Sequence, residues 1–203
     1  MFTDRLRDQF KSIIDPAASF LLKIGLTPNG VTILGWVGHF AAAVLAAAGR
    51  FTWAGLVILI LAPMDALDGA MARQRGITSK FGAFFDSVVD RYSEMVLYGG
   101  ILVYYASRGD LLGSALTFIA MMGSLMVSYT RARAEGLGFS AKIGLFSRVE
   151  RYLVLIPALL FRLVPVGMGI LALFTNITAV QRIVFVNKQA ALSAQADQSV
   201  KGD

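Results

Sequence analysis

The sequence predicts an all-α integral membrane protein with six transmembrane helices, preceded by an amphipathic helix in the membrane interface. Of its 203 residues 56% are hydrophobic and the mean hydropathy is +0.65, whereas soluble domains average about 45–50% apolar residues. A bilayer-spanning helix needs about 20 mainly apolar residues. Six stretches come close to or exceed that length, at residues 31–48, 53–72, 81–107, 112–129, 149–163 and 166–186. The length predicts one domain, which we place at residues 1–188.

The segment at residues 1–24 has the pattern of a surface helix. Its apolar positions recur at helical spacing, with charged residues on the other faces; they are Phe2, Leu6, Phe10, Ile13 and Ile14. Such a helix lies in the plane of the membrane interface. The alternative is an ordinary helix that packs on its own protein.

The opposite end, residues 189–203, is polar and rich in Ala, Ser and Gln. Because it has little apolar surface to bury, we expect a disordered tail. The chain has no cysteine, which excludes disulfides and thiol chemistry.

The positive charges predict the orientation. The net charge is +6, which in so apolar a chain indicates contact with anionic lipid headgroups rather than with nucleic acid. Fifteen Lys and Arg residues fall at the termini and in the loops on one side of the predicted spans. Only Arg50, Arg108 and Arg162 fall on the other side. Positively charged loops stay in the cytoplasm, so we expect both termini and the motif described next to lie on the cytoplasmic side of the plasma membrane.

Four aspartates lie at or within the ends of two apolar stretches. Asp65 and Asp68 share one helix face, and Asp86 and Asp90 share a face of the next helix. A carboxylate at the centre of a membrane helix costs about 3 kcal/mol. If the two helices pack antiparallel, all four carboxylates converge, and like charges that close require cations between them. Mg²⁺ prefers oxygen ligands, and two such ions balance four carboxylates, so the sequence predicts a magnesium site.

Glycines, an alanine and an arginine accompany the aspartates, giving the pattern D-x-x-D-G-x-x-A-R-x(8)-G-x-x-x-D-x-x-x-D. This pattern resembles the signature of the CDP-alcohol phosphotransferases, membrane enzymes that make phospholipids from a cytidine-diphosphate donor. The resemblance implies a six-helix membrane fold, commonly dimeric, that uses Mg²⁺ or Mn²⁺. It implies metal ligands at Asp65, Asp68 and Asp86, and at Asp90 a general base that can also touch one metal ion.

The same resemblance implies a binding site for the CDP-linked donor. Small residues permit close approach to the helix backbones, although they also permit tight helix packing. The first-helix element L-T-P-N-G-V-T combines a capping residue with proline and resembles the family's nucleotide-holding element. The candidate donor-binding residues are Pro28, Asn29, Thr32, Gly69, Ala72, Arg73, Ser79 and Gly82. At the position of Ser79, Thr78 can serve equally.

A cationic cluster indicates an anionic acceptor such as a sugar phosphate. Its members are Arg131, Arg133, Lys142, Arg148, Arg151 and Arg182. The elements S-Y-x-[KR]-A-R-A-E-x-x-G and E-R resemble those of prokaryotic phosphatidylinositol-phosphate synthases, which implies inositol phosphate as the acceptor and CMP as the released product. Charge alone also allows glycerol phosphate or another alcohol as the acceptor. Some of these cations are also explained by the positive-inside rule, without any role in binding.

Two other classes of protein compete with the enzyme. An ion or proton transporter also keeps acids within its spans, but it does not require the small residues and Arg73 at these offsets. A non-catalytic lipid-binding protein does not require all four aspartates.

Overall fold

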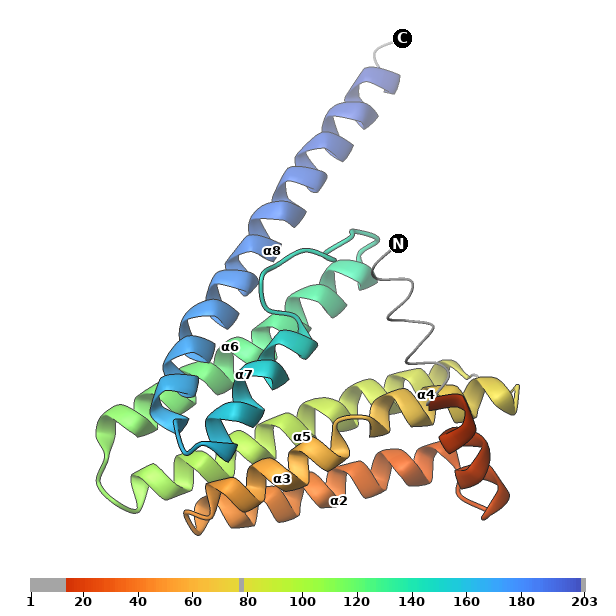
Figure 1. Cartoon of the computed structure of the whole chain (residues 1–203). Helices are drawn as coiled ribbons and strands as arrows, with labels where there is room; N and C mark the ends of the chain where they lie inside the picture. The colour runs from red at the N-terminus through yellow and green to blue at the C-terminus, as the bar shows by residue number, and fades with distance from the viewer. Residues whose placement is uncertain (1–13, 77–78, 202–203) are drawn as a thin grey trace, which may run out of the picture. The chain divides into compact units, whose positions relative to one another are not determined.

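The structure is a computed structural model that describes residues 14–76 and 79–201, apart from the side chains at 65, 194 and 196–201. This part of the chain is helical and contains no strand, which confirms the predicted all-α class. Figure 1 shows helices α2 to α8. The chain divides into two compact units, Met1–Gly100 and Ile101–Asp203.

In the first unit, helix α2 (Pro28–Ala47) begins at the predicted cap. The hydroxyl of Thr27 accepts a hydrogen bond from the Gly30 N–H at 3.1 Å, and Pro28 occupies the first turn. Proline suits this position because its missing N–H would have no helical partner there. Helix α2 packs against α3 (Phe51–Leu61) and α4 (Met64–Gln74).

Helices α3 and α4 together occupy the second predicted span, with a break between them. Pro63 lies at this break and cannot donate a backbone hydrogen bond. Its carbonyl accepts from the N–H groups of Ala66 and Leu67 at 3.1 Å each, which starts α4. Helix α4 carries Asp65 and Asp68, so the first aspartate pair follows directly after the break.

Residues 14–23 are helical and pack on the protein itself. Ala18 is completely buried in a cluster with Val31, Ala70 and Met71. The end of α4 is also tied to this helix: Gln74 donates to the Asp15 carbonyl at 2.9 Å and accepts from the Ser19 hydroxyl at 2.9 Å. Ile14 packs against the same cluster, whereas the other apolar positions of the predicted interfacial helix, 2, 6, 10 and 13, lie outside the described residues.

Helix α5 (Lys80–Ala106) is 27 residues long and carries the second aspartate pair. It approaches α2 so closely that a Cβ atom at Gly100 would lie 2.2 Å from the Ala43 carbonyl oxygen. Only glycine fits such a contact, so Gly100 fixes how closely α5 lies against α2.

The second unit contains α6 (Leu111–Gly136), α7 (Arg148–Leu160) and α8 (Val164–Lys201), and α8 packs against both others. Asp110 caps α6 by accepting from the Gly113 N–H at 2.8 Å. At Gly123 the two long helices nearly touch, because a Cβ there would lie 2.1 Å from the Thr175 hydroxyl.

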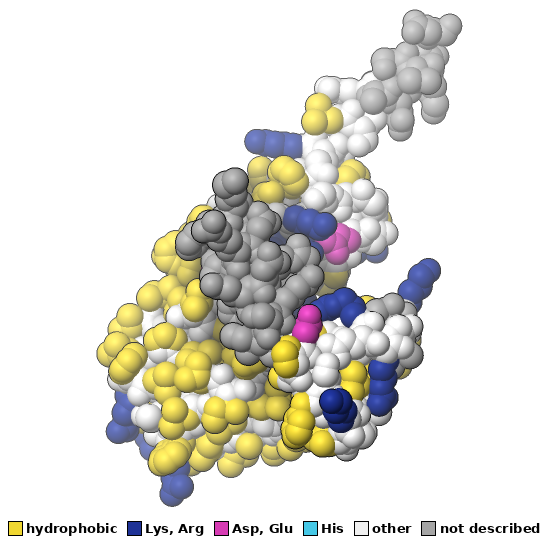
Figure 2. All heavy atoms as spheres, turned by 45° about the vertical axis from the view of Figure 1, so that its right-hand side comes forward, with side chains coloured by type: hydrophobic (Ala, Val, Ile, Leu, Met, Phe, Trp, Pro, Cys, Tyr) yellow, Lys and Arg dark blue, Asp and Glu magenta, His cyan; other side chains and the backbone are white. Residues whose placement is uncertain are grey.

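Four stretches of the described residues are long and apolar enough to cross a membrane: Pro28–Ala47, Phe51–Gln74, Leu111–Gly136 and Val164–Ser193. They coincide with four of the six predicted spans. Helix α5 is long enough but interrupted by charges, and α7 has only 13 residues, about 20 Å at 1.5 Å per residue, so for these two the prediction stays a prediction. Many large apolar side chains are exposed, as the yellow surface in Figure 2 shows, which suits contact with lipid.

The expectation of a disordered tail at 189–203 stays a prediction. In the structure, helix α8 continues through residues 189–201 and ends at Lys201. The physical reason is composition: Ala, Gln and Lys are strong helix formers, so a segment poor in apolar residues can still extend an existing helix.

Candidate active site

A pocket of about 520 Å³ lies in the first unit, where the N-terminal ends of α2 and α5 meet α4. All eight residues predicted to bind the donor line it, together with Asp68 and Asp86. The full lining is Thr27, Pro28, Asn29, Thr32, Asp68, Gly69, Ala72, Arg73, Ser79, Gly82, Ala83 and Asp86. Residues separated by more than 50 positions in the sequence therefore line the same pocket.

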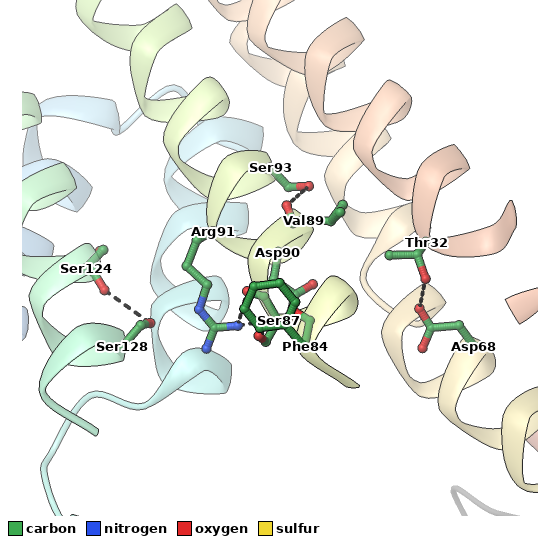
Figure 3. Close-up of polar contacts among 10 residues, drawn as sticks. All are labelled: Thr32, Asp68, Phe84, Ser87, Val89, Asp90, Arg91, Ser93, Ser124 and Ser128. Carbon is green, nitrogen blue, oxygen red and sulfur yellow. Dashed lines mark hydrogen bonds and ion pairs between the residues drawn. The ribbon is translucent and has the colours of Figure 1, made fainter. Parts of the chain in front are cut away.

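On α4, one helix face contributes an acidic residue, two small residues and an arginine to the pocket. Asp68, Gly69, Ala72 and Arg73 are spaced so that they point the same way. Asp68 is only 7% exposed, and the Thr32 hydroxyl donates to its Oδ2 atom at 2.7 Å (Figure 3). This bond orients the carboxylate and joins α2 to α4 at the pocket.

On α5, the first turn and the face behind it complete the site. The Ser79 hydroxyl accepts from the Gly82 N–H at 2.9 Å, so Ser79 caps the helix; Thr78 lies outside the described residues. Asp86 lines the pocket, and Asp90 follows one turn later, 8% exposed. Arg91 lies 3.4 Å from the Asp90 Oδ2 atom and donates to the Ser87 carbonyl at 2.7 Å.

One signature carboxylate, that of Asp68, lies within electrostatic reach of two others. Asp68 interacts electrostatically with both Asp86 and Asp90. Among the side chains that the structure describes, no three acidic, His or Cys groups are placed to hold a metal ion; the side chain of Asp65 lies outside that set. The ligand atoms nevertheless suit a hard divalent cation. The site offers several carboxylates, one of which is oriented by a hydroxyl, and Mg²⁺ and Mn²⁺ bind such oxygen ligands.

The six predicted acceptor residues all lie in the second unit, and they differ in environment. Arg151 and Arg182 are buried, at 3% and 4% exposure. Arg182 interacts electrostatically with Arg131 and Arg151, so the structure brings these three together. Arg133 and Lys142 are exposed.

Several of these arginines already have partners within the protein. Arg131 pairs with Glu135 at 2.9 Å. Arg148 lies over the ring of Tyr152, 5.9 Å from its centroid. Arg182 donates from Nε to the Ile143 carbonyl at 2.9 Å and from Nη1 to the Val127 carbonyl. Arg182 thus also has a structural role, which its charge alone did not indicate.

Sequence reasoning missed two lining residues, Thr27 and Ala83, although Thr27 was recognised as a helix cap. It also missed the larger groove of about 880 Å³ on α8, which is lined mainly by apolar side chains such as Leu173, Ile177 and Val184. This groove contains no acid among its lining residues, so we place the chemistry in the smaller pocket.

An apolar helical fold with a pocket that combines carboxylates, small residues and an arginine suits a membrane protein that binds a divalent cation and a phosphorylated ligand. Comparison with known proteins agrees: the sequence model for CDP-alcohol phosphatidyltransferase matches residues 25–187. The chain belongs to the CDP-alcohol phosphatidyltransferase family.

Two curated relatives resemble the chain over most of its length. The phosphatidylinositol phosphate synthase of Streptomyces avermitilis is 35% identical over 212 residues, covering 97% of this chain and 86% of the relative. The archaetidylinositol phosphate synthase of Pyrococcus horikoshii is 36% identical over 186 residues, covering 91% and 96%.

Solved structures of the phosphatidylinositol phosphate synthase of Mycobacterium tuberculosis share the fold. The form with CDP-DAG bound has a TM-score of 0.77 and 36% identity, covering 86% of this chain and 94% of that one. The form in complex with manganese and citrate has a TM-score of 0.75 and 35% identity, covering 85% and 88%.

Proposed function

We propose that the chain transfers the phosphatidyl group of CDP-diacylglycerol to a hydroxyl of inositol phosphate and releases CMP, as a step of phospholipid biosynthesis. The observation that carries the proposal is the 520 Å³ pocket, in which two signature aspartates and eight candidate donor-binding residues line one cavity. The relatives' names support the acceptor, because the bacterial and archaeal proteins differ in lipid but share inositol phosphate.

In the donor complex, Arg73 binds the diphosphate, since its forked N–H groups match phosphate oxygens. Gly69, Ala72 and Gly82 leave room for the cytidine and its sugar. The free N–H groups at the start of α2 suit a phosphate or a ribose hydroxyl, next to Pro28 and Asn29. The mycobacterial neighbour solved with CDP-DAG supports a donor of this class.

We assign the divalent cations to the four signature aspartates, Asp65, Asp68, Asp86 and Asp90, and infer two Mg²⁺ ions with Mn²⁺ as a substitute. The carboxylate set fits such ions, and the neighbour solved with manganese supports a divalent cation. When bound, the cations neutralise the diphosphate and stabilise CMP as it departs.

Asp90 is the residue we assign as general base. It accepts the proton of the acceptor hydroxyl, and the resulting oxygen attacks the phosphorus that carries diacylglycerol. A new P–O bond forms as the bond to the CMP phosphate breaks, so no covalent intermediate on the protein is needed. The burial of Asp90 and its contact with Arg91 hold the carboxylate in place.

The cationic cluster of the second unit binds the phosphate of the acceptor in this proposal. Its six residues are Arg131, Arg133, Lys142, Arg148, Arg151 and Arg182. Convergence of Arg131, Arg151 and Arg182 supports an anion there, because neighbouring like charges are stabilised by a bound phosphate. We further propose a homodimer in the plasma membrane, with the active site and both termini cytoplasmic.

A CMP-release assay with a panel of acceptors tests this function. The full chain in liposomes receives CDP-diacylglycerol, Mg²⁺ and, in separate reactions, inositol phosphate, glycerol phosphate or free inositol. We expect release that depends on inositol phosphate. Faster release with glycerol phosphate would assign the alternative acceptor, and no release with any alcohol would refute the enzyme.

A further inference from the structure

Residues 140–146, between α6 and α7, form an irregular segment that runs beside α8 (Figure 1); we call it the anchored segment. We propose that Gln189 and Thr178 of α8 are positioning residues for the acceptor, acting by fixing both ends of this segment. The inference rests on the proposed function, because the segment carries Lys142 and leads into Arg148.

Gln189 holds the first end by pairing with the backbone of a single residue. Its Nε2 atom donates to the Ser140 carbonyl at 2.6 Å, and its Oε1 atom accepts from the Ser140 N–H at 3.2 Å. The side-chain amide thus replaces the two bonds that a neighbouring strand would make. A segment without regular secondary structure needs such partners, because its backbone N–H and C=O groups are not paired within a helix or a sheet.

Thr178 holds the other end. Its hydroxyl accepts from the Phe146 N–H at 3.0 Å, and the Phe146 ring stacks on Phe174 with centroids 5.1 Å apart. Between the ends, Arg182 donates to the Ile143 carbonyl at 2.9 Å. The segment is therefore fixed at every third residue, at positions 140, 143 and 146.

The contact with α8 is close as well as hydrogen-bonded. Gly144 has φ +121°, and a Cβ atom there would lie 2.4 Å from the Thr178 Cγ2 atom. A side chain at this position would lift the segment from the helix. The backbone and α8 thus fit each other at the middle of the segment, where Gly144 is required.

These anchors determine where two acceptor candidates lie. Lys142 is located between the anchors at Ser140 and Ile143, and Arg148 comes two residues after the anchor at Phe146. Gln189 carries no charge, and both atoms of its amide are engaged with Ser140, so we attribute its effect on the acceptor to the position of Lys142. Loss of an anchor should therefore weaken the binding of inositol phosphate and leave the binding of the CDP-linked donor unchanged.

The test compares Gln189→Ala and Thr178→Val with Gln195→Ala, a matched glutamine exposed on the same helix. Backbone amide hydrogen exchange is measured for residues 139–147 in the full chain. The KM values for inositol phosphate and CDP-diacylglycerol are measured in parallel. We expect faster exchange of the anchored segment and an acceptor KM raised by about tenfold, because the charge-assisted contact of Lys142 with the acceptor phosphate is lost when the segment moves. The donor KM stays the same.

Gln189→Glu keeps an acceptor for the Ser140 N–H but sets a carboxylate oxygen against the Ser140 carbonyl in place of the donor, so the anchored segment should exchange at least as fast as in Gln189→Ala. Unchanged exchange in Gln189→Ala would overturn the anchoring, and faster exchange with an unchanged acceptor KM would overturn the positioning role. Failure of the proposed function is recognised separately, as absence of inositol phosphate transfer in the wild-type chain, and leaves the exchange result intact.

Discussion

The hydroxyl of Thr32 on α2 donates to the carboxylate of Asp68 on α4 at 2.7 Å. The same hydroxyl lies 3.2 Å from the Pro28 carbonyl, one turn earlier in α2, which is a second acceptor for its one proton. The first turn of one helix therefore helps to place the group that orients a signature carboxylate on another. The sequence predicts Thr32 as a donor-binding residue, and the structure adds this contact with Asp68.

Replacing Thr32 by Val removes the donor to Asp68 while conserving the side-chain volume. Groups that orient a metal ligand typically contribute about 10- to 100-fold to metal affinity, so we expect the Mg²⁺ concentration for half-maximal CMP release to rise by that factor. Thr32→Ser keeps the hydroxyl and should stay near wild type. An unchanged Mg²⁺ requirement in Thr32→Val would show that the bond does not orient a metal ligand.

Removal of divalent cations with EDTA should abolish CMP release, because the diphosphate charge is then not neutralised. Addition of Mg²⁺ or Mn²⁺ in excess of the chelator should restore it. The measurement is the initial rate of CMP release before and after the addition. Full activity in EDTA would contradict the metal assignment for the four aspartates.

Asp90→Asn keeps the shape of the side chain but cannot take a proton. General-base catalysis contributes about 10²- to 10⁴-fold, so we expect kcat to fall by that factor while CDP-diacylglycerol still binds. The two quantities are measured by steady-state CMP release and by equilibrium binding of the donor. A variant with normal turnover would exclude Asp90 as the base.

Arg151→Ala removes a buried cation from the acceptor cluster. We expect the KM for inositol phosphate to rise by at least about tenfold, since charge-assisted hydrogen bonds contribute about 1.5–3 kcal/mol, with donor binding retained. Arg50→Ala, an exposed arginine of the first unit, is the control. Equal losses for donor and acceptor would indicate a general structural defect and overturn the assignment.

Gly100→Ala tests the close approach of α5 to α2. The added Cβ would lie 2.2 Å from the Ala43 carbonyl oxygen, whereas at the adjacent Gly99 a Cβ meets no atom within 4 Å. Overpacking costs about 1–3 kcal/mol, so thermal unfolding in detergent should occur at a lower temperature for Gly100→Ala. Gly99→Ala should be neutral or stabilising, and equal effects at both positions would refute the contact.

The motif was predictable because its residues are local. Asp65, Asp68, Gly69 and Ala72 are placed by helical periodicity alone, and the capping at Thr27 followed from Thr-Pro. The approach of α2 to α4 was not predictable from periodicity, so the bond between Thr32 and Asp68 appeared only in three dimensions.

The contacts of the C-terminal helix, in contrast, could not be predicted from the sequence. Gln189 looked like the start of a disordered tail because composition measures apolar content and not hydrogen bonding. Its role depends on Ser140, 49 residues earlier, and a single sequence contains no signal for that pairing. Arg182 was recognised by charge, but its two backbone carbonyl partners were not predictable for the same reason.

The link between residues 14–23 and the end of α4 has a mechanical consequence. Gln74 directly follows Arg73 and forms hydrogen bonds with the Asp15 carbonyl and the Ser19 hydroxyl of the N-terminal helix. The last turn of α4, which carries Arg73, is therefore tethered to the N-terminal helix by side-chain hydrogen bonds as well as by packing. Fraying of that turn would require these bonds to break, so residues 14–23 act as a clamp on the end of α4.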